Sequence, residues 1–214
     1  LIEDCSQAHG AIYKGKKVGS FGHISTWSFC QDKIISTGGE GGIISTNDKK
    51  LWLKLWSLKD HGKNYYNCFI KKKKTGFKWL HDDLGSNYRM TELQAVIGRL
   101  QLKSLDQQIK KRNLIANLYL NSLKNYYHKY KILKKPDFKC QTCPLKQSVN
   151  VCSRCTHAFY RLSLFINKNK VKQIKLISEL NKNKINCSVG SCPEIYREKI
   201  FKKLKFYPKK RLPN

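Results

Sequence analysis

The sequence predicts an α/β fold, and three observations support this prediction. Segments of strand composition alternate along the chain with segments of helical periodicity, as in α/β proteins. A hydrophobic content of 40% with 11% aromatic residues is that of a globular chain. A length of 214 residues suffices for one domain or one and a half.

The expected strands lie in the first part of the chain. Leu1 to Asp4 resembles the end of a buried strand. Residues 24–29 are rich in Ile, Thr, Trp and Phe, and residues 41–46 form another short apolar run, so both are predicted strands. Residues 6–12 can form a short helix or turn, and residues 14–22 are polar and contain glycines, which predicts a loop.

Helical periodicity is clearest in the middle of the chain. Thr91-Glu92-Leu93-Gln94 has the form of a capping box, and apolar residues recur behind it at helical spacing. This pattern predicts a long helix from Thr91 to Tyr127 that can accommodate a bend. Further expected elements are a helix over 48–60, a strand over 158–166 and a helix over 171–181. Residues 62–84 are irregular and long enough to carry a function.

Charge and composition exclude several classes of function. The formal net charge is +29, but the lysines are scattered and do not form one stripe with stacking aromatics, so we expect no nucleic-acid partner. No apolar run approaches the roughly 20 residues of a membrane helix, and no signal segment opens the chain. Nine cysteines without such a signal fit a reducing cytoplasm. We therefore expect a cytoplasmic protein without a membrane partner. Because the chain also lacks an initiator Met, we expect it to be part of a longer protein.

Lys33 is the first candidate functional residue. It follows a short apolar and aromatic run and precedes a turn with four glycines. A lysine held against packed backbone can lose part of its proton affinity by desolvation and become a nucleophile, as a Schiff-base lysine requires. On this segment alone, a surface lysine before a hairpin turn is the better explanation.

Three further residues change that balance. Asp4 ends an apolar strand, and strand ends in open α/β sheets face the ligand crevice. Ser28 lies five residues before Lys33 and supplies a hydroxyl for phosphate. Asn87 precedes a helix, where an amide could also serve an anion. Pyridoxal phosphate requires a lysine and an acid for its ring nitrogen. Taken singly, each residue also has a plain structural explanation, as a helix cap, a strand hydroxyl or a helix-entry turn.

Four segments, in order, resemble the DegT family of sugar aminotransferases, which belong to the fold-type I pyridoxal-phosphate superfamily. They are Ile2-Glu3-Asp4-Cys5-Ser6-Gln7-Ala8-His9-Gly10-Ala11, residues 28–42, Asp60-His61-Gly62 and residues 85–95. The resemblance resumes at Thr156-His157-Ala158-Phe159-Tyr160 and continues through the following helix.

The resemblance implies a role for each matching residue. Lys33 would form the Schiff base with pyridoxal 5'-phosphate and move protons. Asp4 would pair with the pyridine nitrogen, and Gln7 would contact the hydroxyl side of the ring. Ser28 would bind the cofactor phosphate. Asn87 would reach the phosphate in the neighbouring subunit, so a homodimer is expected, with Arg89 shaping the dimer and the substrate mouth.

The resemblance also implies an architecture. Residues 1–131 would be the C-terminal portion of the cofactor-binding large domain, with a mixed, mostly parallel sheet flanked by helices. Residues 132–214 would be an incomplete small α+β domain, with a cysteine-containing insert at 136–156. The family's amino-terminal phosphate turn and ring-stacking aromatic are absent, so we expect the chain alone to be inactive.

The insert carries a CxxC-x8-CxxC pattern formed by Cys140, Cys143, Cys152 and Cys155. Thiolates at this spacing can bind one zinc ion, but a loop with reduced thiols explains the pattern as well, so we assign no metal site.

The resulting hypothesis is a transaminase that moves an amino group, with glutamate as the implied donor, to a nucleotide-linked keto-sugar. The product would enter polysaccharide or amino-sugar biosynthesis. Lys33 argues against a family dehydratase, which carries a histidine at that position. A non-catalytic fragment, or a basic nucleic-acid-binding module with a zinc knuckle, remains the alternative.

Overall fold

A computed structural model describes residues 1–71, 76–129, 131, 133–134, 154–190, 194–206 and 208. The chain divides into two compact units. Unit 1 comprises Leu1–Leu123 and Asp137–Leu162, and unit 2 comprises Lys124–Pro136 and Ser163–Asn214. The sequence placed a single boundary after residue 131, whereas the chain passes between the units three times.

A three-stranded mixed sheet forms the centre of unit 1. Strands β1 (Ile2–Asp4) and β4 (Ile24–Ser28) are parallel neighbours, with Asp4 opposite Thr26. Strand β5 (Gly42–Ser45) pairs antiparallel with β4, which gives the order β1-β4-β5. All three strands lie where the sequence predicts them. Because β1 and β4 are parallel, Asp4 and Ser28 lie at the same edge of the sheet.

The segment expected to be a loop after residue 13 contains a small hairpin. Strands β2 (Ile12–Tyr13) and β3 (Lys16–Lys17) pair antiparallel around Lys14 and Gly15. Both turn residues have positive φ, 50° and 79°, as a two-residue hairpin turn requires. Strands of two residues are too short for a periodic pattern, so the sequence does not reveal them.

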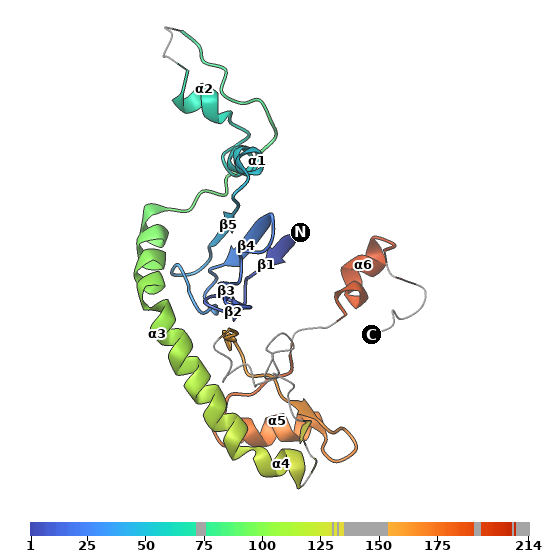
Figure 1. Ribbon diagram of the computed structural model, residues 1–214. Coiled ribbons are helices and arrows are strands. Elements are labelled where there is room, and N and C mark those ends of the chain that lie inside the picture. The colour runs from blue at the N-terminus through green and yellow to red at the C-terminus, as the bar shows by residue number, and fades with distance from the viewer. Residues whose placement is uncertain are drawn as a thin grey trace. The chain divides into compact units, whose positions relative to one another are not determined.

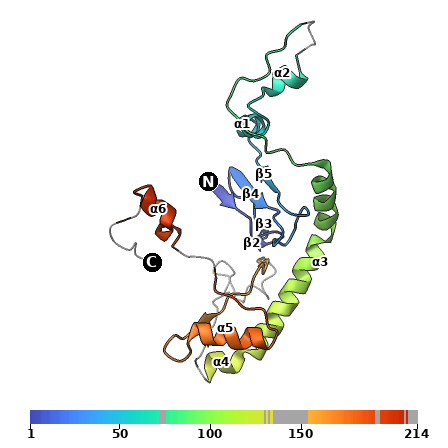
Figure 2. The same ribbon diagram turned by 180° about the vertical axis from the view of Figure 1, so that it is seen from behind.

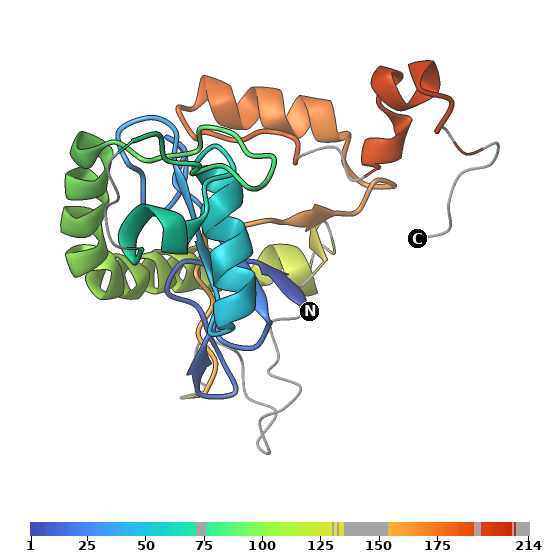
Figure 3. The ribbon, with the colours of Figure 1, turned by 90° about the horizontal axis from the view of Figure 1, so that it is seen from above.

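Helices α1 (Lys49–Lys59) and α2 (Tyr65–Phe69) lie side by side in unit 1 (Figure 3). Asp48 caps α1 by accepting from the amides of Lys50 and Leu51, and Asn64 caps α2 in the same manner. The ring of Tyr65 packs edge-on against Trp52 and Trp56, at 5.0 and 5.2 Å between centroids. The predicted helix over 48–60 is therefore confirmed, while α2 falls in the segment expected to be irregular.

Helix α3 (Glu92–Ser122) follows one side of the sheet in both front and back views (Figures 1 and 2). The predicted capping box is present, because the Thr91 hydroxyl accepts from the Gln94 amide and the Gln94 side chain accepts from the Thr91 amide. The helix is interrupted at Leu123, and α4 (Lys124–His128) follows it. No helix among the described residues is long and apolar enough to cross a bilayer.

The core of unit 1 joins this helix to the loops around the sheet. Its buried cluster consists of Ala11, Ile34, Ile109 and Ala158. Gly10 lies against the helix with φ +75°, and a β-carbon there would stand 2.7 Å from Ile109 Cγ1. Only glycine fits this approach, which brings the chain after β1 directly onto α3.

The strand predicted over 158–166 is wrong except for its last two residues, Phe165–Ile166. Arg112 donates to the carbonyls of Phe159 and Tyr160, and Asn113 donates to the carbonyl of His157. Phe159 has φ +45°, which no strand residue adopts. Side chains of α3 therefore donate hydrogen bonds to the backbone carbonyls of this segment, which a neighbouring strand would otherwise bind.

Unit 2 is smaller, and its described part contains more helix than strand. Strands β6 (Leu133–Lys134) and β7 (Phe165–Ile166) pair antiparallel. Helix α5 (Gln173–Lys182) confirms the helix predicted over 171–181. A 3-10 turn, η1 (Ile195–Arg197), and helix α6 (Lys199–Lys203) follow.

Candidate active site

The Lys33 loop, defined as residues 30–41, leaves the end of β4 and returns to the start of β5. Lys33 donates its amide to the Cys30 carbonyl at 3.0 Å. Ile34 and Ile35 are both 3% exposed. The lysine backbone is thus held between a turn and two core residues, and its side chain is only 14% exposed, which contradicts the surface lysine that its segment alone suggests.

The glycine turn of this loop is fixed from two sides. Thr37 is buried, donates its amide to Phe29 and its hydroxyl to the Glu40 carbonyl. Gly38 and Gly39 have φ of 82° and 152°, which side chains adopt only with strain. From α3, Gln94 donates to the Glu40 carbonyl at 2.8 Å and Gln101 accepts from the Ser36 amide at 3.0 Å. The loop is therefore attached to the helix as well as to the sheet.

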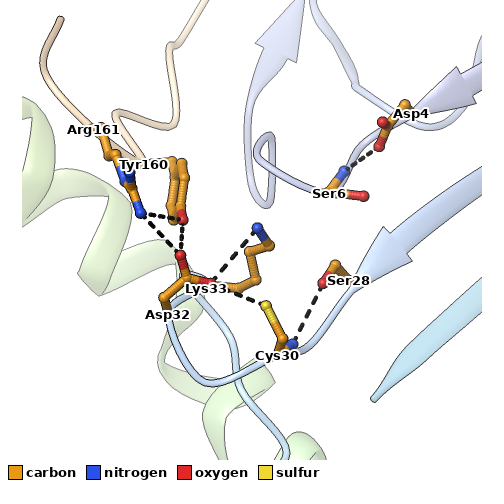
Figure 4. Close-up of polar contacts among 8 residues, drawn as sticks. All are labelled: Asp4, Ser6, Ser28, Cys30, Asp32, Lys33, Tyr160 and Arg161. Carbon is orange, nitrogen blue, oxygen red and sulfur yellow. Dashed lines mark hydrogen bonds and ion pairs between the residues drawn. The ribbon is translucent and has the colours of Figure 1, made fainter. Parts of the chain in front are cut away.

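Asp4 and Ser28 lie on one side of Lys33, at the carboxyl ends of β1 and β4 (Figure 4). Asp4 Oδ1 accepts from the Ser6 amide at 3.0 Å, and Ser28 Oγ accepts from the Cys30 amide at 3.4 Å. Hydrogen bonds from Ser6 lower the pKa of Asp4, and the charge of Lys33 lowers it further. Asp4 is therefore an anion at neutral pH, near enough to Lys33 for their charges to interact.

Asp32, Tyr160 and Arg161 lie on the other side of Lys33 (Figure 4). The Lys33 amine is 3.7 Å from Asp32 Oδ1 and 4.9 Å from the centroid of the Tyr160 ring, and the lysine side chain is 14% exposed. Asp32 Oδ2 accepts from the Tyr160 hydroxyl and from Arg161 Nη2, the latter at 3.0 Å. Cys30 Sγ donates to Asp32 Oδ1 at 3.0 Å.

These contacts correct the expected proton affinity of Lys33. Burial lowers the pKa of its amine, as the sequence argument assumes, but the interactions with Tyr160, Asp32 and Cys30 outweigh burial. The net result is a raised pKa. The pKa of Asp32 falls well below its usual range, first through hydrogen bonds from Cys30 and Tyr160. Without a bound ligand, the amine is a cation beside a carboxylate.

Gln7 and His9 lie in the turn that follows β1. Gln7 is exposed, whereas His9 is 2% exposed and packs 5.4 Å from the Trp27 ring and 5.7 Å from the Phe29 ring. Burial lowers the pKa of His9, so its ring is neutral near pH 7. His9 therefore packs the turn that follows Asp4 and contains Gln7 against the rings of Trp27 and Phe29.

Asn87 is not brought to Lys33 by the contacts of this chain. Its carboxamide oxygen accepts from Arg89 Nε at 3.0 Å, and its backbone forms a bridge with Asp60. Asp60 is 8% exposed and pairs with Lys63 at 2.9 Å, so it anchors the segment. Asn87 itself is exposed on this anchored segment.

The packing around Gly62 holds the same segment. A β-carbon at Gly62 would stand 1.7 Å from the Asp83 carbonyl oxygen, and φ is +76°. The Asp60-His61-Gly62 motif is therefore explained by close backbone approach.

The cysteine pattern falls mainly outside the described residues, which include Cys155 but not Cys140, Cys143 and Cys152. Cys155 is 4% exposed. Within the described ranges, no three His, Cys, Asp or Glu side chains are grouped as a metal site requires.

The sequence argument missed Asp32 and Arg161. Their contacts join residues 128 and 129 positions apart. No spacing rule connects such distant positions, although Tyr160 lies in a motif that carries the resemblance.

This arrangement can hold an electrophilic, phosphorylated ligand. It combines a primary amine, a carboxylate at the edge where open sheets bind ligands, and a strand-end hydroxyl. Asp4, Ser28 and Lys33 are the residues that could hold such a cofactor.

Comparison with known proteins identifies the family. The model of the DegT/DnrJ/EryC1/StrS aminotransferase family matches residues 1–214. The chain is 41% identical over 140 residues to the GDP-perosamine synthase of Escherichia coli O157:H7, covering 61% of this chain and 35% of that protein. It is 38% identical over 166 residues to a UDP-4-amino-4,6-dideoxy-N-acetyl-beta-L-altrosamine transaminase of Campylobacter jejuni, covering 70% and 41%.

Solved structures agree in fold. The aminotransferase from Psychrobacter cryohalolentis superposes with a TM-score of 0.86 at 43% identity, covering 99% of this chain and 52% of that one. An Escherichia coli GDP-4-keto-6-deoxy-D-mannose-3-dehydratase with bound hydrated PLP gives 0.70 at 25% identity, covering 97% and 50%. The chain thus spans about half or less of the length of these relatives. The fold is that of fold-type I aminotransferases, and the chain belongs to the DegT/DnrJ/EryC1/StrS aminotransferase family.

Proposed function

We propose that the natural protein that carries this chain is a pyridoxal-phosphate-dependent aminotransferase acting on a nucleotide-linked keto-sugar. One observation carries the proposal: the parallel pairing of β1 and β4 brings Asp4, Ser28 and the Lys33 loop to one edge of the sheet. This occurs in a chain that the family model matches throughout.

The residues at this edge fit pyridoxal phosphate. Lys33 has the amine that the cofactor aldehyde requires, and its side chain is largely shielded from water. Asp4 is held anionic by Ser6, as a partner for a protonated ring nitrogen must be. Ser28 offers a hydroxyl to phosphate, and Gln7 lies exposed in the turn beyond Asp4, where it can contact the ring.

When bound, the cofactor withdraws electrons from the carbon that bears the amine. The chain's own residues supply the rest. Asp4 keeps the proton on the ring nitrogen, because its lowered pKa keeps its charge. Lys33 binds the cofactor and moves a proton at its Nζ. The attached glycine turn keeps that amine in place.

Names of the relatives support the substrate class. They include a GDP-perosamine synthase, a UDP-linked amino-sugar transaminase and a dTDP-3-amino-3,6-dideoxy-alpha-D-galactopyranose transaminase. We therefore propose a nucleotide-linked keto-sugar as acceptor, glutamate as donor, and a role in polysaccharide or amino-sugar biosynthesis.

We further propose a cytoplasmic homodimer without nucleic-acid or membrane partners. Asn87 supports the dimer, because it is exposed on a segment that Asp60 anchors and its contacts do not reach Lys33. Its exposed position makes it accessible to a neighbouring subunit's site, with Arg89 holding its carboxamide.

The test is spectroscopic and uses the natural protein. Wild-type protein mixed with pyridoxal phosphate should show visible absorbance, and Lys33→Ala should lose it, because the amine that binds the aldehyde is removed. Lys17→Ala is the matched control, since Lys17 is an exposed lysine paired with Asp106 at 3.1 Å. A wild-type protein that never takes up the cofactor would contradict the proposal.

A further inference from the structure

We propose that Asp32 is a positioning residue, whose carboxylate holds the Lys33 amine in its charged form and turns it toward the Tyr160–Arg161 side. Arg161 weakens this effect, because it pairs with the same carboxylate and partly neutralises its charge. The consequence for cofactor loading rests on the proposed function, but the contacts themselves do not.

Geometry divides the Asp32 carboxylate between two sets of partners. Oδ1 faces inward, 3.7 Å from the Lys33 amine and 3.0 Å from Cys30 Sγ. Oδ2 faces residues 157–161, called the returning segment from here on, where the Tyr160 hydroxyl and Arg161 Nη2 both donate to it. One carboxylate therefore joins the Lys33 loop to a segment about 130 positions away (Figure 4).

The environment makes this contact stronger than an ordinary surface ion pair. The Lys33 side chain is only 14% exposed, while that of Asp32 is 45% exposed. Coulomb attraction weakens less where water is excluded from one partner. The Tyr160 ring also covers the amine, at 4.9 Å.

Other ionisable groups also face Lys33, but none of them offsets the negative charge of Asp32. Asp4 and His9 interact with its charge from the sheet side, where Asp4 is an anion and His9 is neutral near pH 7. Cys30 interacts with it from the Lys33 loop, and Tyr160 from the segment that also carries Arg161. Arg161 is the one cation paired with Asp32 besides Lys33 among the described residues.

Removal of Asp32 and removal of its partner Arg161 should therefore have opposite effects on the reactivity of Lys33. A lysine must lose its proton before it attacks an aldehyde, and a nearby carboxylate opposes that loss. Removing Asp32 should make Lys33 more reactive at a given pH. Removing Arg161 leaves the carboxylate uncompensated, so it should make Lys33 less reactive.

Acetylation of Lys33 measures the reactivity of its amine without any cofactor. The full chain is exposed briefly to acetic anhydride across a pH series, and mass spectrometry quantifies modification at Lys33. Asp32→Asn should shift the profile to lower pH, with several-fold faster modification near neutrality. Arg161→Gln should shift it to higher pH, and Asp32→Glu should partly restore the wild-type profile. Asp106→Asn, which removes an exposed carboxylate paired with Lys17, should leave it unchanged.

The directions of the two pH shifts test the proposal, because loss of packing alone would shift the acetylation profiles of both variants in the same direction. An unchanged Asp32→Asn profile, or shifts of the same sign in Asp32→Asn and Arg161→Gln, would overturn the proposal. Should either variant fail to fold, the direction of the other decides. Failure of the proposed function is separate, since it appears as wild-type protein that takes up no pyridoxal phosphate.

Discussion

Glu3 closes the loop that leads into β4 with a single carboxylate. Its oxygens accept from the amides of Gly19 at 2.8 Å, Phe21 at 2.7 Å and Gly22 at 2.5 Å. Partial burial raises the pKa of Glu3, but these amides outweigh it, so the net pKa is lowered. A side chain one residue before Asp4 thus fixes the strand that positions Asp4.

Glu3→Gln should therefore destabilise the chain, by about 1–3 kcal/mol, because the amide cannot satisfy the same donors. The free energy of unfolding from urea titration checks this. A carboxyl with a lowered folded pKa stabilises above its unfolded pKa of about 4.3 and loses that stabilisation as pH falls. The difference between wild type and Glu3→Gln should shrink below that pH. Glu40→Gln, at an exposed carboxylate, is the control. A difference that does not change with pH would contradict this account.

At this scale the sequence predicted Asp4, Ser28 and Lys33 as candidates, because strand ends and a lysine before a glycine turn are local patterns. It could not predict Asp32 and Arg161 as a pair. Their contact depends on Arg112 and Asn113 holding the returning segment, and no local pattern records such tertiary contacts.

At the scale of elements, the start of α3 couples the helix to the Lys33 loop. Thr91 and Gln94 cap the helix reciprocally, and Gln94 also donates to the Glu40 carbonyl at 2.8 Å. Thr91→Ala should remove the cap alone and cost about 1 kcal/mol. Gln94→Ala should remove the cap partner and the tether together.

Hydrogen exchange separates the two effects. Amides of residues 36–41 should exchange faster in Gln94→Ala than in Thr91→Ala, while both variants lower the free energy of unfolding. Equal exchange rates in that turn would mean that Gln94 contributes only to the cap.

The elements also show which sequence signals are strong. The capping box and apolar period predicted α3 over most of its length, because both are repeated local signals. Alternation over 158–166 predicted a strand wrongly, because the alternating residues lie on backbone that α3 side chains bind. Alternation of apolar and polar residues predicts a strand correctly only where another strand lies beside it to form the hydrogen bonds of a sheet.

At the scale of the whole molecule, the apolar face of α3 is only partly covered within this chain. Ile109 is buried, whereas Leu93 is 79%, Val96 53% and Leu100 60% exposed. A row of exposed apolar residues beside a candidate site is typical of an interface. Because the chain spans about half or less of its relatives' length, this face can pack against the rest of the protein or against a second subunit.

Subunit mixing tests whether Asn87 serves the neighbouring site. Lys33→Ala and Asn87→Ala should each abolish or greatly reduce transamination of a nucleotide-linked keto-sugar. If Asn87 acts across the dimer, a mixed dimer contains one site with both changes and one with neither. Random mixing of equal amounts should then restore about a quarter of wild-type activity.

Lys33→Ala mixed with Asp4→Asn is the matched control, since these residues lie at one edge of the same sheet and should not complement. Failure of Lys33→Ala and Asn87→Ala to complement, in dimers shown to have exchanged subunits, would place Asn87 in its own subunit's site.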